Sequence, residues 1–351
     1  MTKINFMATK RAALACAAGL ALGALAIPSA AQAQGADAAF FKGKTVKIVV
    51  GYGPGGGYDA YARMLAGPIG EKLGATVIVE NQPGAGGVNA LNRIFAAKGD
   101  PLQMMIVNGT AAAMAQLVGQ KGVRYDLAKV GHLGTIAASP WVWLVHSKSP
   151  IKTPQDAVKY GKSIRWSASG PIDGLADGAW VTCEALKLNC EVVIGYKGSN
   201  DAARAVMQGE MDAIYVSDTS AQNYAATGDV RAVAVMNRKP SRFFPDVKPI
   251  FDAIPISDEG KWLIDFHSTV EDLGRIMITP PDVPAAQIKV LQAAFMDVLN
   301  DKDIQAMGAK SKRYIEPVAP AQTLKNVKAV VEDMTEAQRK RLREVMRLET
   351  R

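Results

Sequence analysis

Two glycine-rich turns are the parts of this sequence best suited to chemistry. Residues 51–59 read Gly-Tyr-Gly-Pro-Gly-Gly-Gly-Tyr-Asp and residues 81–87 read Asn-Gln-Pro-Gly-Ala-Gly-Gly, each after a β-branched run and before a helix-forming segment. Glycine lets a ligand approach the backbone closely, and the free N–H groups of a first helical turn carry the positive end of the helix dipole. Two such turns on neighbouring strands predict a site for one carboxylate, with about 1.5–3 kcal/mol from each charge-assisted hydrogen bond. The alternative is a purely conformational role in tight strand-to-helix reversals.

The first turn also matches a dinucleotide-binding fingerprint. Gly51, Gly53 and Gly56 have the Gly-x-Gly-x-x-Gly spacing, and Glu80 ends the next strand near the place of a ribose-binding acid. Pro54, however, lies inside the turn that would wrap the pyrophosphate. A soluble α/β enzyme, such as a nucleotide-dependent oxidoreductase, is therefore the runner-up interpretation.

Side chains that would support catalysis or metal binding are sparse. The three histidines, His132, His146 and His267, are isolated from one another and have no partner at metal-ligand spacing. A hydrogen-bonded structural role is the favoured interpretation for each. No Gly-x-Ser-x-Gly nucleophile elbow occurs. We therefore expect a protein that is not an enzyme and that uses neither a metal nor a cofactor.

The elements that must position these turns alternate between short β-branched runs and longer helix-period segments, which is typical of α/β folds with crossover helices. Between the first two runs, Tyr61, Leu65, Ile69 and Leu73 recur every four residues and predict one buried helix face. From residue 284 onward the pattern is helical. The predicted strands are residues 45–52, 76–80, 103–108, 141–146, 163–167, 191–196, 212–217, 230–236 and 275–279.

The N-terminal region is typical of a signal peptide. Lys3, Lys10 and Arg11 precede an apolar run at residues 12–27, and small residues follow up to Ala33. The run is about 16 residues long, which is short for a membrane span of roughly 20. We expect a signal peptide at residues 1–33, cleavage near Ala33 and a periplasmic protein, whose formal net charge falls from +8 to +5 on cleavage.

The 318 residues that remain are too many for one ordinary core and predict two lobes. We expect lobe 1 at residues 34–143 and 272–351, including the C-terminal helices, and lobe 2 at residues 144–271, with mostly parallel sheets flanked by helices. The densest basic tract, residues 339–341, favours a solvated helix face. A monomer without a nucleic-acid partner is expected.

Cys183 and Cys190 are the two cysteines that follow the expected signal peptide. In an oxidising compartment a pair this close could close a turn between a helix and the next strand as a disulfide. A continuous helix through both would hold them roughly 10 Å apart and forbid the bond. Both alternatives stay open at this point.

Six segments, in their order and spacing, resemble the Bug-type periplasmic receptors of tripartite tricarboxylate transporters, and the resemblance runs through nearly the whole mature chain. None of them is specific alone. They are the Pro54-Gly55-Gly56 turn with Asp59, Asn81-x-Pro83-Gly84-Ala85-Gly86-Gly87, Ser167-Ala168-Ser169-Gly170, Tyr196-Lys197-Gly198-Ser199, Gly209-x-x-Asp212 and Gly228-x-x-Arg231-Ala232-x-Ala234-Val235.

The resemblance implies a two-lobed Venus-flytrap fold that closes by hinge motion on a small organic carboxylate held by backbone amides and water. It also implies that membrane subunits of a transporter are partners, unless the receptor serves sensing. The ligand-binding residues that it implies are Tyr52, Gly55, Gly56, Tyr58, Asp59, Gly86, Gly87 and Thr110 in lobe 1, and Ser167, Ser169, Gly170, Tyr196, Lys197, Ser199 and Ser217 in lobe 2.

The sequence departs from the family pattern on the second lobe. After Gly170 the family usually runs Gly-Ser and soon a histidine, whereas residues 171–174 here read Pro-Ile-Asp-Gly and Asp177 lies near the histidine position. Val216 stands where many relatives place an acid, and Tyr58 adds bulk where a small hydroxyl residue is common. These changes favour a monocarboxylate or an aromatic acid over an amino acid.

Overall fold

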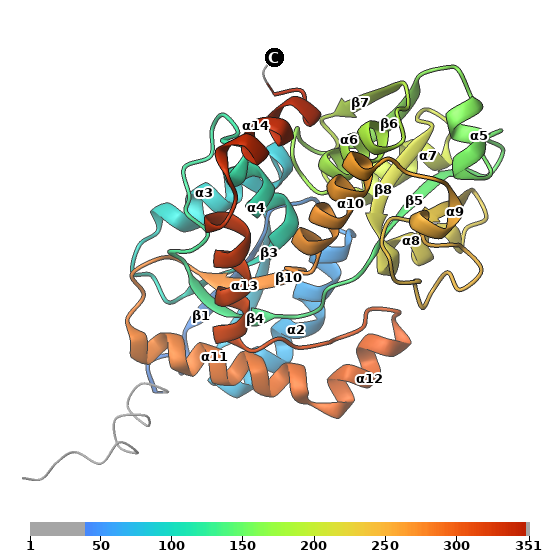
Figure 1. Ribbon diagram of the computed structural model, residues 1–351. Helices are drawn as coiled ribbons and strands as arrows, with labels where there is room; N and C mark the ends of the chain where they lie inside the picture. The colour runs from blue at the N-terminus through green and yellow to red at the C-terminus, as the bar shows by residue number, and fades with distance from the viewer. Residues whose placement is uncertain (1–38, 349–351) are drawn as a thin grey trace, which may run out of the picture.

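The computed structural model describes residues 39–348, so the expected signal peptide lies outside the described residues. The described chain forms two lobes, each built around a five-stranded sheet with helices packed on it (Figure 1). We call the part that contains β1–β4 and β10 lobe 1, and the part that contains β5–β9 lobe 2. The two-lobed α/β architecture predicted from the sequence is confirmed.

Lobe 1 has a sheet with the strand order β2-β1-β3-β10-β4. Its strands are β1 (Thr45–Val50), β2 (Thr76–Asn81), β3 (Gln103–Asn108), β4 (Gly131–Thr135) and β10 (Arg275–Thr279). Its helices are α2 (Gly57–Leu73), the 3-10 turn η1 (Ala85–Gly87), α3 (Val88–Ala96), α4 (Gly109–Leu117), α11 (Ala285–Asn300), α12 (Lys302–Lys310), α13 (Pro320–Glu332) and α14 (Glu336–Val345).

Both faces of the lobe 1 sheet are covered. Val46, Ile48 and Val50 join the apolar cluster that contains α2 and α11, whereas Val49 joins the cluster of α3 and α4. This division follows from the period of two along a strand. The predicted face of α2 is buried from Tyr61 through Leu73, so α2 fixes the turn that precedes it.

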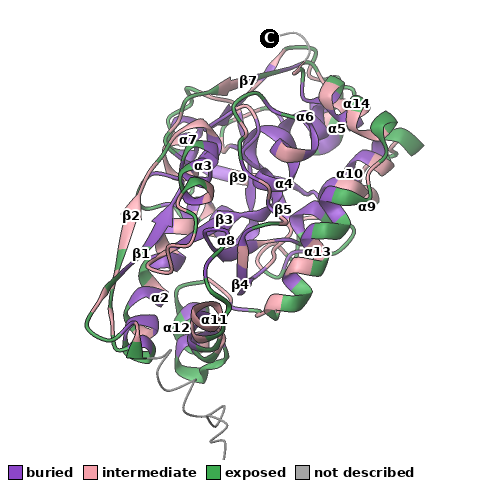
Figure 2. Cartoon of the chain, turned by 90° about the vertical axis from the view of Figure 1, so that its left-hand side faces the viewer, coloured by how far each residue is buried: buried purple, intermediate pink, exposed green. Residues whose placement is uncertain are grey.

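Lobe 2 has the strand order β7-β6-β8-β5-β9. Its strands are β5 (Trp141–His146), β6 (Ile164–Ala168), β7 (Cys190–Ile194), β8 (Ala213–Ser217) and β9 (Val230–Val235). Its helices are α5 (Pro154–Lys159), α6 (Leu175–Ala185), α7 (Ser199–Met207), α8 (Asp218–Ala225), α9 (Ile250–Ala253) and α10 (Asp258–Glu271). Figure 2 shows that strands β3, β5 and β9 are buried, whereas the edge strand β2 is only partly covered.

The expectation of mostly parallel sheets is confirmed, because four of the five strands in each sheet run in the same direction and one strand runs against them. In lobe 1, β1 pairs in parallel with β2 and β3, but β10 is antiparallel to β3 and β4. In lobe 2, β6 pairs in parallel with β7 and β8, but β5 is antiparallel to β8 and β9. The reason is that β5 and β10 each follow a crossing between the lobes and enter the sheet from the opposite end.

Strand β4 was not predicted from the sequence. The predicted strands match β1–β3 and β5–β10 with ends within two residues, but β4 was not predicted. Its sequence Gly-His-Leu-Gly-Thr contains Gly131 and Gly134, and glycine weakens a strand signal. The strand is held by antiparallel pairing with β10 and by helices α11 and α13.

The chain crosses between the lobes through two segments that lie side by side. The N–H of Ile136 donates to the carbonyl of Arg275 at 2.8 Å, and the N–H of Arg275 donates to Ala137 at 2.9 Å. Because β5 belongs to lobe 2 from Trp141 onward, the first crossing precedes that residue. The predicted boundary between residues 143 and 144 would cut β5 in two and is therefore wrong.

Cys183, in α6, and Cys190, at the start of β7, form a disulfide. Helix α6 ends at Ala185, and Lys187 has a left-handed φ of +54°. The chain therefore turns between the cysteines instead of continuing as one helix, which was the alternative that would have kept the thiols apart.

The C-terminal helix α14 reaches across to lobe 2. Arg341 pairs with Glu184 of α6 at 2.7 Å and with Glu259 of α10 at 2.6 Å. Arg339 donates to main-chain carbonyls, including that of Val331 at 2.9 Å. The basic tract at residues 339–341 was expected on a solvated face, but these two arginines are half-buried and satisfied. No helix within residues 39–348 has the length and apolarity needed to span a membrane.

Candidate functional site

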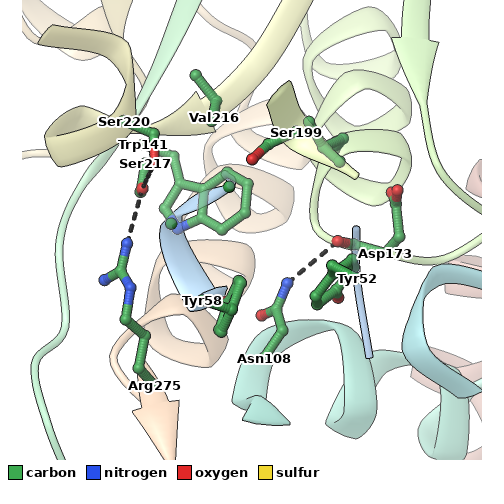
Figure 3. Close-up of a pocket in the computed structure, with 13 residues that line it drawn as sticks. Tyr52, Tyr58, Asn108, Trp141, Asp173, Ser199, Val216, Ser217, Ser220 and Arg275 are labelled. Atoms are coloured by element: carbon green, nitrogen blue, oxygen red, sulfur yellow. Dashed lines mark hydrogen bonds between the residues drawn. The ribbon is translucent and has the colours of Figure 1, made fainter. Parts of the chain in front are cut away.

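A small cavity lies between the lobes, next to the carboxyl ends of β1, β3 and β8 (Figure 3). Its volume is about 20 Å³, close to the space that one water molecule needs. It is lined by Tyr52, Gly56, Gly57, Tyr58, Asn108, Trp141, Asp173, Leu175, Ser199, Val216, Ser217, Ser220 and Arg275.

The lobes are closed over this cavity. The N–H of Gly53 in lobe 1 donates to the carbonyl of Lys197 in lobe 2 at 2.7 Å. The Asn108 side chain at the end of β3 donates to the carbonyl of Asp173 at 3.1 Å. A Cβ atom placed on Gly170 would lie only 2.5 Å from the backbone nitrogen of Gly86. Direct contacts on several sides therefore limit the space that the closed form leaves for a ligand.

Arg275 brings a positive charge into the cavity wall. It is the first residue of β10 and only 4 % exposed. Its Nη2 donates to Ser217 Oγ at 2.9 Å and to Thr219 Oγ1 at 3.1 Å, and Nη1 lies 3.3 Å from Ser139 Oγ. Its Nε has no hydrogen-bond partner within the described chain. Position and chemistry suit this guanidinium to bind an anion in the cavity.

No carboxylate of the described residues forms an ion pair with Arg275. None of the ion pairs formed within residues 39–348, taken as nitrogen–oxygen distances up to 4.0 Å, includes this residue. Burial raises the pKa of Asp218, and the charge of Arg275 opposes this rise from beyond ion-pair distance. The Asp218 carboxylate instead accepts a hydrogen bond from the Ser241 hydroxyl at 2.8 Å. A buried charge without a close counter-charge is costly. An anionic ligand would supply the missing charge.

Aromatic rings form much of the remaining wall. Tyr52 and Tyr58 stack with centroids 5.1 Å apart, and Trp141 stacks on Tyr215 at 5.3 Å. The Tyr52 hydroxyl donates to the carbonyl of Gly86 at 3.0 Å, which ties the two glycine turns together. Burial raises the pKa of Tyr58 despite the opposing charge of Arg275, so this phenol stays neutral at physiological pH.

The first glycine turn contributes fewer free amides than predicted. The N–H of Gly55 donates to the Asp59 carboxylate at 2.9 Å, and Asp59 is paired with Arg63. Gly56 and Gly57 line the cavity at the start of α2. The side chain of Asn81, in the second turn, donates to the carbonyl of Tyr52 at 3.0 Å. The prediction that the two turns lie on neighbouring strands is confirmed, because β1 pairs with β2.

The second glycine turn faces a separate recess. Gly86 and Gly87 have left-handed φ values of +66° and +95°, which favour glycine. They line a small space beside the main cavity, and Tyr52 and Asn108 border both. Gly86 and Gly87 therefore lie close to the cavity, but they do not line its wall.

The loop before α6 satisfies its own donors. The Asp173 carboxylate accepts hydrogen bonds from the backbone and side chain of Ser169, both at 2.5 Å, and from the N–H of Gly170 at 3.1 Å and of Ala176 at 2.6 Å. Burial raises the pKa of Asp173 to about 6, although these donors favour the charged form. Ser169 and Gly170, expected as ligand contacts, are thus bound to Asp173.

Four further predicted residues lie away from the cavity wall. The Thr110 hydroxyl donates to the carbonyl of Val270 at 3.3 Å, and the Ser167 hydroxyl donates to that of Ala202 at 2.9 Å. Both hydroxyls therefore have structural partners. Tyr196 and Lys197 do not line the cavity, and the carbonyl of Lys197 accepts a hydrogen bond from Gly53 of lobe 1.

Five predicted residues do line the cavity: Tyr52, Gly56, Tyr58, Ser199 and Ser217. Sequence reasoning missed Asn108, Trp141, Leu175, Ser220 and Arg275. It noted Gly57 only as part of the first glycine turn, and Asp173 and Val216 only as departures from a family pattern. Trp141 and Arg275 stand directly after the two crossings between the lobes. A search for polar and aromatic residues at such crossings would have found both.

Behind Trp141 lies a buried group of charges. His267 of α10 lies between Asp177 of α6, with Nε2–Oδ1 at 3.5 Å, and Glu271, with Nδ1–Oε1 at 3.1 Å. The Tyr215 hydroxyl donates to Glu271 at 2.5 Å. Burial alone would lower the pKa of His267, but the two carboxylates raise it to about 10. The group is closed off from the cavity and joins α6 to α10.

The geometry does not support a nucleotide site at the first turn. Glu80, the candidate ribose ligand, pairs with Lys47 at 3.1 Å and accepts from Gln82 at 2.7 Å. Gly53 is hydrogen-bonded to lobe 2, as described above. Among residues 39–348, no three His, Cys, Asp or Glu side chains are grouped as a metal site would require.

Comparison with known sequences supports one family. Residues 61–335 match the family model described as the tripartite tricarboxylate transporter family receptor. A relative from Cupriavidus necator, described as a UPF0065 protein in the gbd 5' region, is 28% identical over 348 residues. The match covers 95% of this chain and 98% of that relative.

Two solved structures share the fold. Periplasmic binding protein BugD matches with a TM-score of 0.72 at 21% identity, covering 86% of this chain and 97% of that one. MatC from Rhodopseudomonas palustris with bound malate matches with a TM-score of 0.71 at 20% identity, covering 86% of this chain and 99% of that one. Both support the two-lobed architecture.

Proposed function

This chain belongs to the tripartite tricarboxylate transporter receptor family, and from that premise we propose that it captures a small organic carboxylate between its two lobes. Arg275 is the observation that carries the proposal. Its guanidinium is buried in the cavity wall and has no close carboxylate partner within the described chain. A ligand carboxylate would provide that partner through charge-assisted hydrogen bonds.

The proposed contacts combine predicted and newly found residues. The residues that were predicted from the sequence and line the cavity are Tyr52, Gly56, Tyr58, Ser199 and Ser217. Asn108, Trp141, Ser220 and Arg275 are added because they line the same cavity. The malate bound by MatC supports a carboxylate as the ligand class.

Ligand entry requires the lobes to separate. The closed cavity of about 20 Å³ is too small for an organic acid without movement of its walls. Two adjacent crossings are the usual place for hinge closure in two-lobed receptors. We propose that the acid binds to the open form and that the side chains and lobes then close around it.

A comparison of acids with their amides tests this function. Each carboxylic acid of a panel is matched with its primary amide, which has similar shape but no charge. We expect some acids to raise the melting temperature and their amides to have little effect, since a ligand at 100 times its Kd adds about 2.7 kcal/mol of stability. The bound acid should be recovered unchanged, as expected for a receptor rather than an enzyme. Equal stabilisation by acids and amides would contradict a charge-dependent site.

We further propose that the chain is exported to the periplasm and acts there as a monomer, delivering its acid to membrane subunits of a transporter or serving sensing. The signal-peptide pattern and the disulfide between Cys183 and Cys190 support export, because disulfides persist in oxidising compartments. The intact mass of protein isolated from the periplasm should correspond to a chain that begins at Gln34. A mass that includes residues 1–33 would contradict cleavage.

A further inference from the structure

The loop between β6 and α6 contains an internal anion. Asp173 is only 1 % exposed, and its carboxylate accepts the four hydrogen bonds described above from Ser169, Gly170 and Ala176. Three of these donors are backbone N–H groups, and Ala176 belongs to the first turn of α6, where the helix dipole favours an anion. The loop has thus formed an anion site and filled it with its own side chain.

The filled site changes what lobe 2 can offer to a ligand. In Figure 3 the Asp173 carboxylate points away from Arg275, and its main-chain carbonyl points towards Asn108. Leu175 and Val216, which also line the cavity, are apolar. The donors of Ser169, Gly170 and Ala176 are therefore occupied by Asp173 and are not available to a ligand group.

The charges of the cavity are therefore unequal at its two sides. Arg275 and Asp173 are the charged side chains among the residues that line it. One guanidinium can neutralise one carboxylate. A second ligand carboxylate would lose its hydration without a second cation to pair with and would lie near the negative charge of Asp173, so its burial would be unfavourable.

We infer that Asp173 is a specificity-determining residue: it takes the place of a second ligand carboxylate, so the cavity selects monocarboxylates with an apolar body over dicarboxylates. This inference rests on the proposed function, because it assumes that Arg275 binds the first carboxylate. The tyrosine and tryptophan rings then cover the apolar body of the ligand.

Matched pairs of acids test the inference. We would titrate the full mature chain at pH 7.5 with hexanoate against adipate, 3-hydroxybutyrate against malate, and benzoate against benzene-1,4-dicarboxylate. Within the pair that binds best, we expect the monocarboxylate to bind at least tenfold more tightly than the dicarboxylate. If the dicarboxylate binds as tightly or more tightly, the inference is overturned while carboxylate capture stands. If no acid of any pair binds, both the inference and the proposed function are overturned.

Variants of Asp173 provide the second arm. Asp173→Ala frees the donors of Ser169, Gly170 and Ala176, so we expect the preference for the monocarboxylate to shrink at least tenfold. Asp173→Asn removes the charge at nearly the same side-chain size and should reduce the preference for the monocarboxylate by a smaller factor. This variant is used if the alanine variant does not fold. Asp258→Ala removes a fully exposed acid of the same lobe and should leave the preference unchanged. A preference that stays at the wild-type ratio in both folded Asp173 variants would show that Asp173 does not set specificity.

Discussion

At the scale of single residues, Arg275 should dominate the affinity. We expect Arg275→Gln to weaken acid binding about 10- to 150-fold, because loss of charge-assisted hydrogen bonds costs about 1.5–3 kcal/mol. Arg275→Lys keeps the charge but not the planar fork of donors and should give an intermediate loss. Isothermal titration calorimetry with the best acid of the panel measures both effects.

The matched control is Arg238→Gln. Arg238 carries the same charge in lobe 2, but it lies outside the cavity and pairs with Asp265 on the surface. Its loss should leave the affinity unchanged. If Arg275→Gln bound the acid as tightly as the wild type, the carboxylate would have to lie elsewhere.

The sequence predicted part of the site at this scale and missed the part that depends on the meeting of the lobes. Tyr52, Tyr58 and Ser199 could be predicted from the sequence because they stand in or next to recognisable turns. Arg275 could not be predicted in this way, because it is the first residue of an ordinary strand. Its role follows from its position directly after a crossing between the lobes. Asp173 carried a local signal, because an acid three residues before Ala176 can accept that N–H in the manner of a helix cap.

At the scale of elements, the glycine turns combine both roles that the sequence left open. Gly56 lines the cavity, as a binding role requires. Gly53 and Gly86 instead let the lobes approach closely, since Gly53 donates to Lys197 and Gly86 packs against Asp173. Sequence spacing could not separate these roles, because the contacts come from lobe 2.

The pairing of α6 with α10 predicts a pH dependence of stability. The pKa of His267 is raised to about 10 in the folded chain, against about 6.5 when unfolded. Its stabilising charge is therefore fully present below about pH 6.5 and is lost as the pH rises through 10. We expect the melting temperature to fall between pH 7 and pH 10 in a series of thermal unfolding scans.

His267→Gln isolates this effect from the titration of surface lysines. The variant should lose about 3–5 kcal/mol of stability at pH 7, because it leaves Asp177 and Glu271 buried without their cation. Its melting temperature should depend less on pH between 7 and 10 than that of the wild type. Parallel curves for the two proteins would mean that His267 is neutral when folded.

At the scale of the whole molecule, the alternation of strands and helices was sufficient to predict two α/β lobes. It was not sufficient to predict the one antiparallel strand of each sheet or the first boundary, because both depend on where the chain crosses. The crossing segments around Ala137 and Gly274 pack so closely that a Cβ on Gly274 would lie 2.3 Å from the carbonyl oxygen of Ala137. The disulfide of α6 and the salt bridges of Arg341 stabilise the outer part of lobe 2 and its contact with α14.

A crystal structure of the protein with its tightest-binding acid would show directly whether Arg275 binds the ligand carboxylate. We expect closed lobes with a ligand carboxylate oxygen about 2.7–2.9 Å from the guanidinium of Arg275 and with the body of the ligand against Tyr58 and Trp141. A carboxylate held by the glycine turns alone, with Arg275 out of contact, would contradict this expectation.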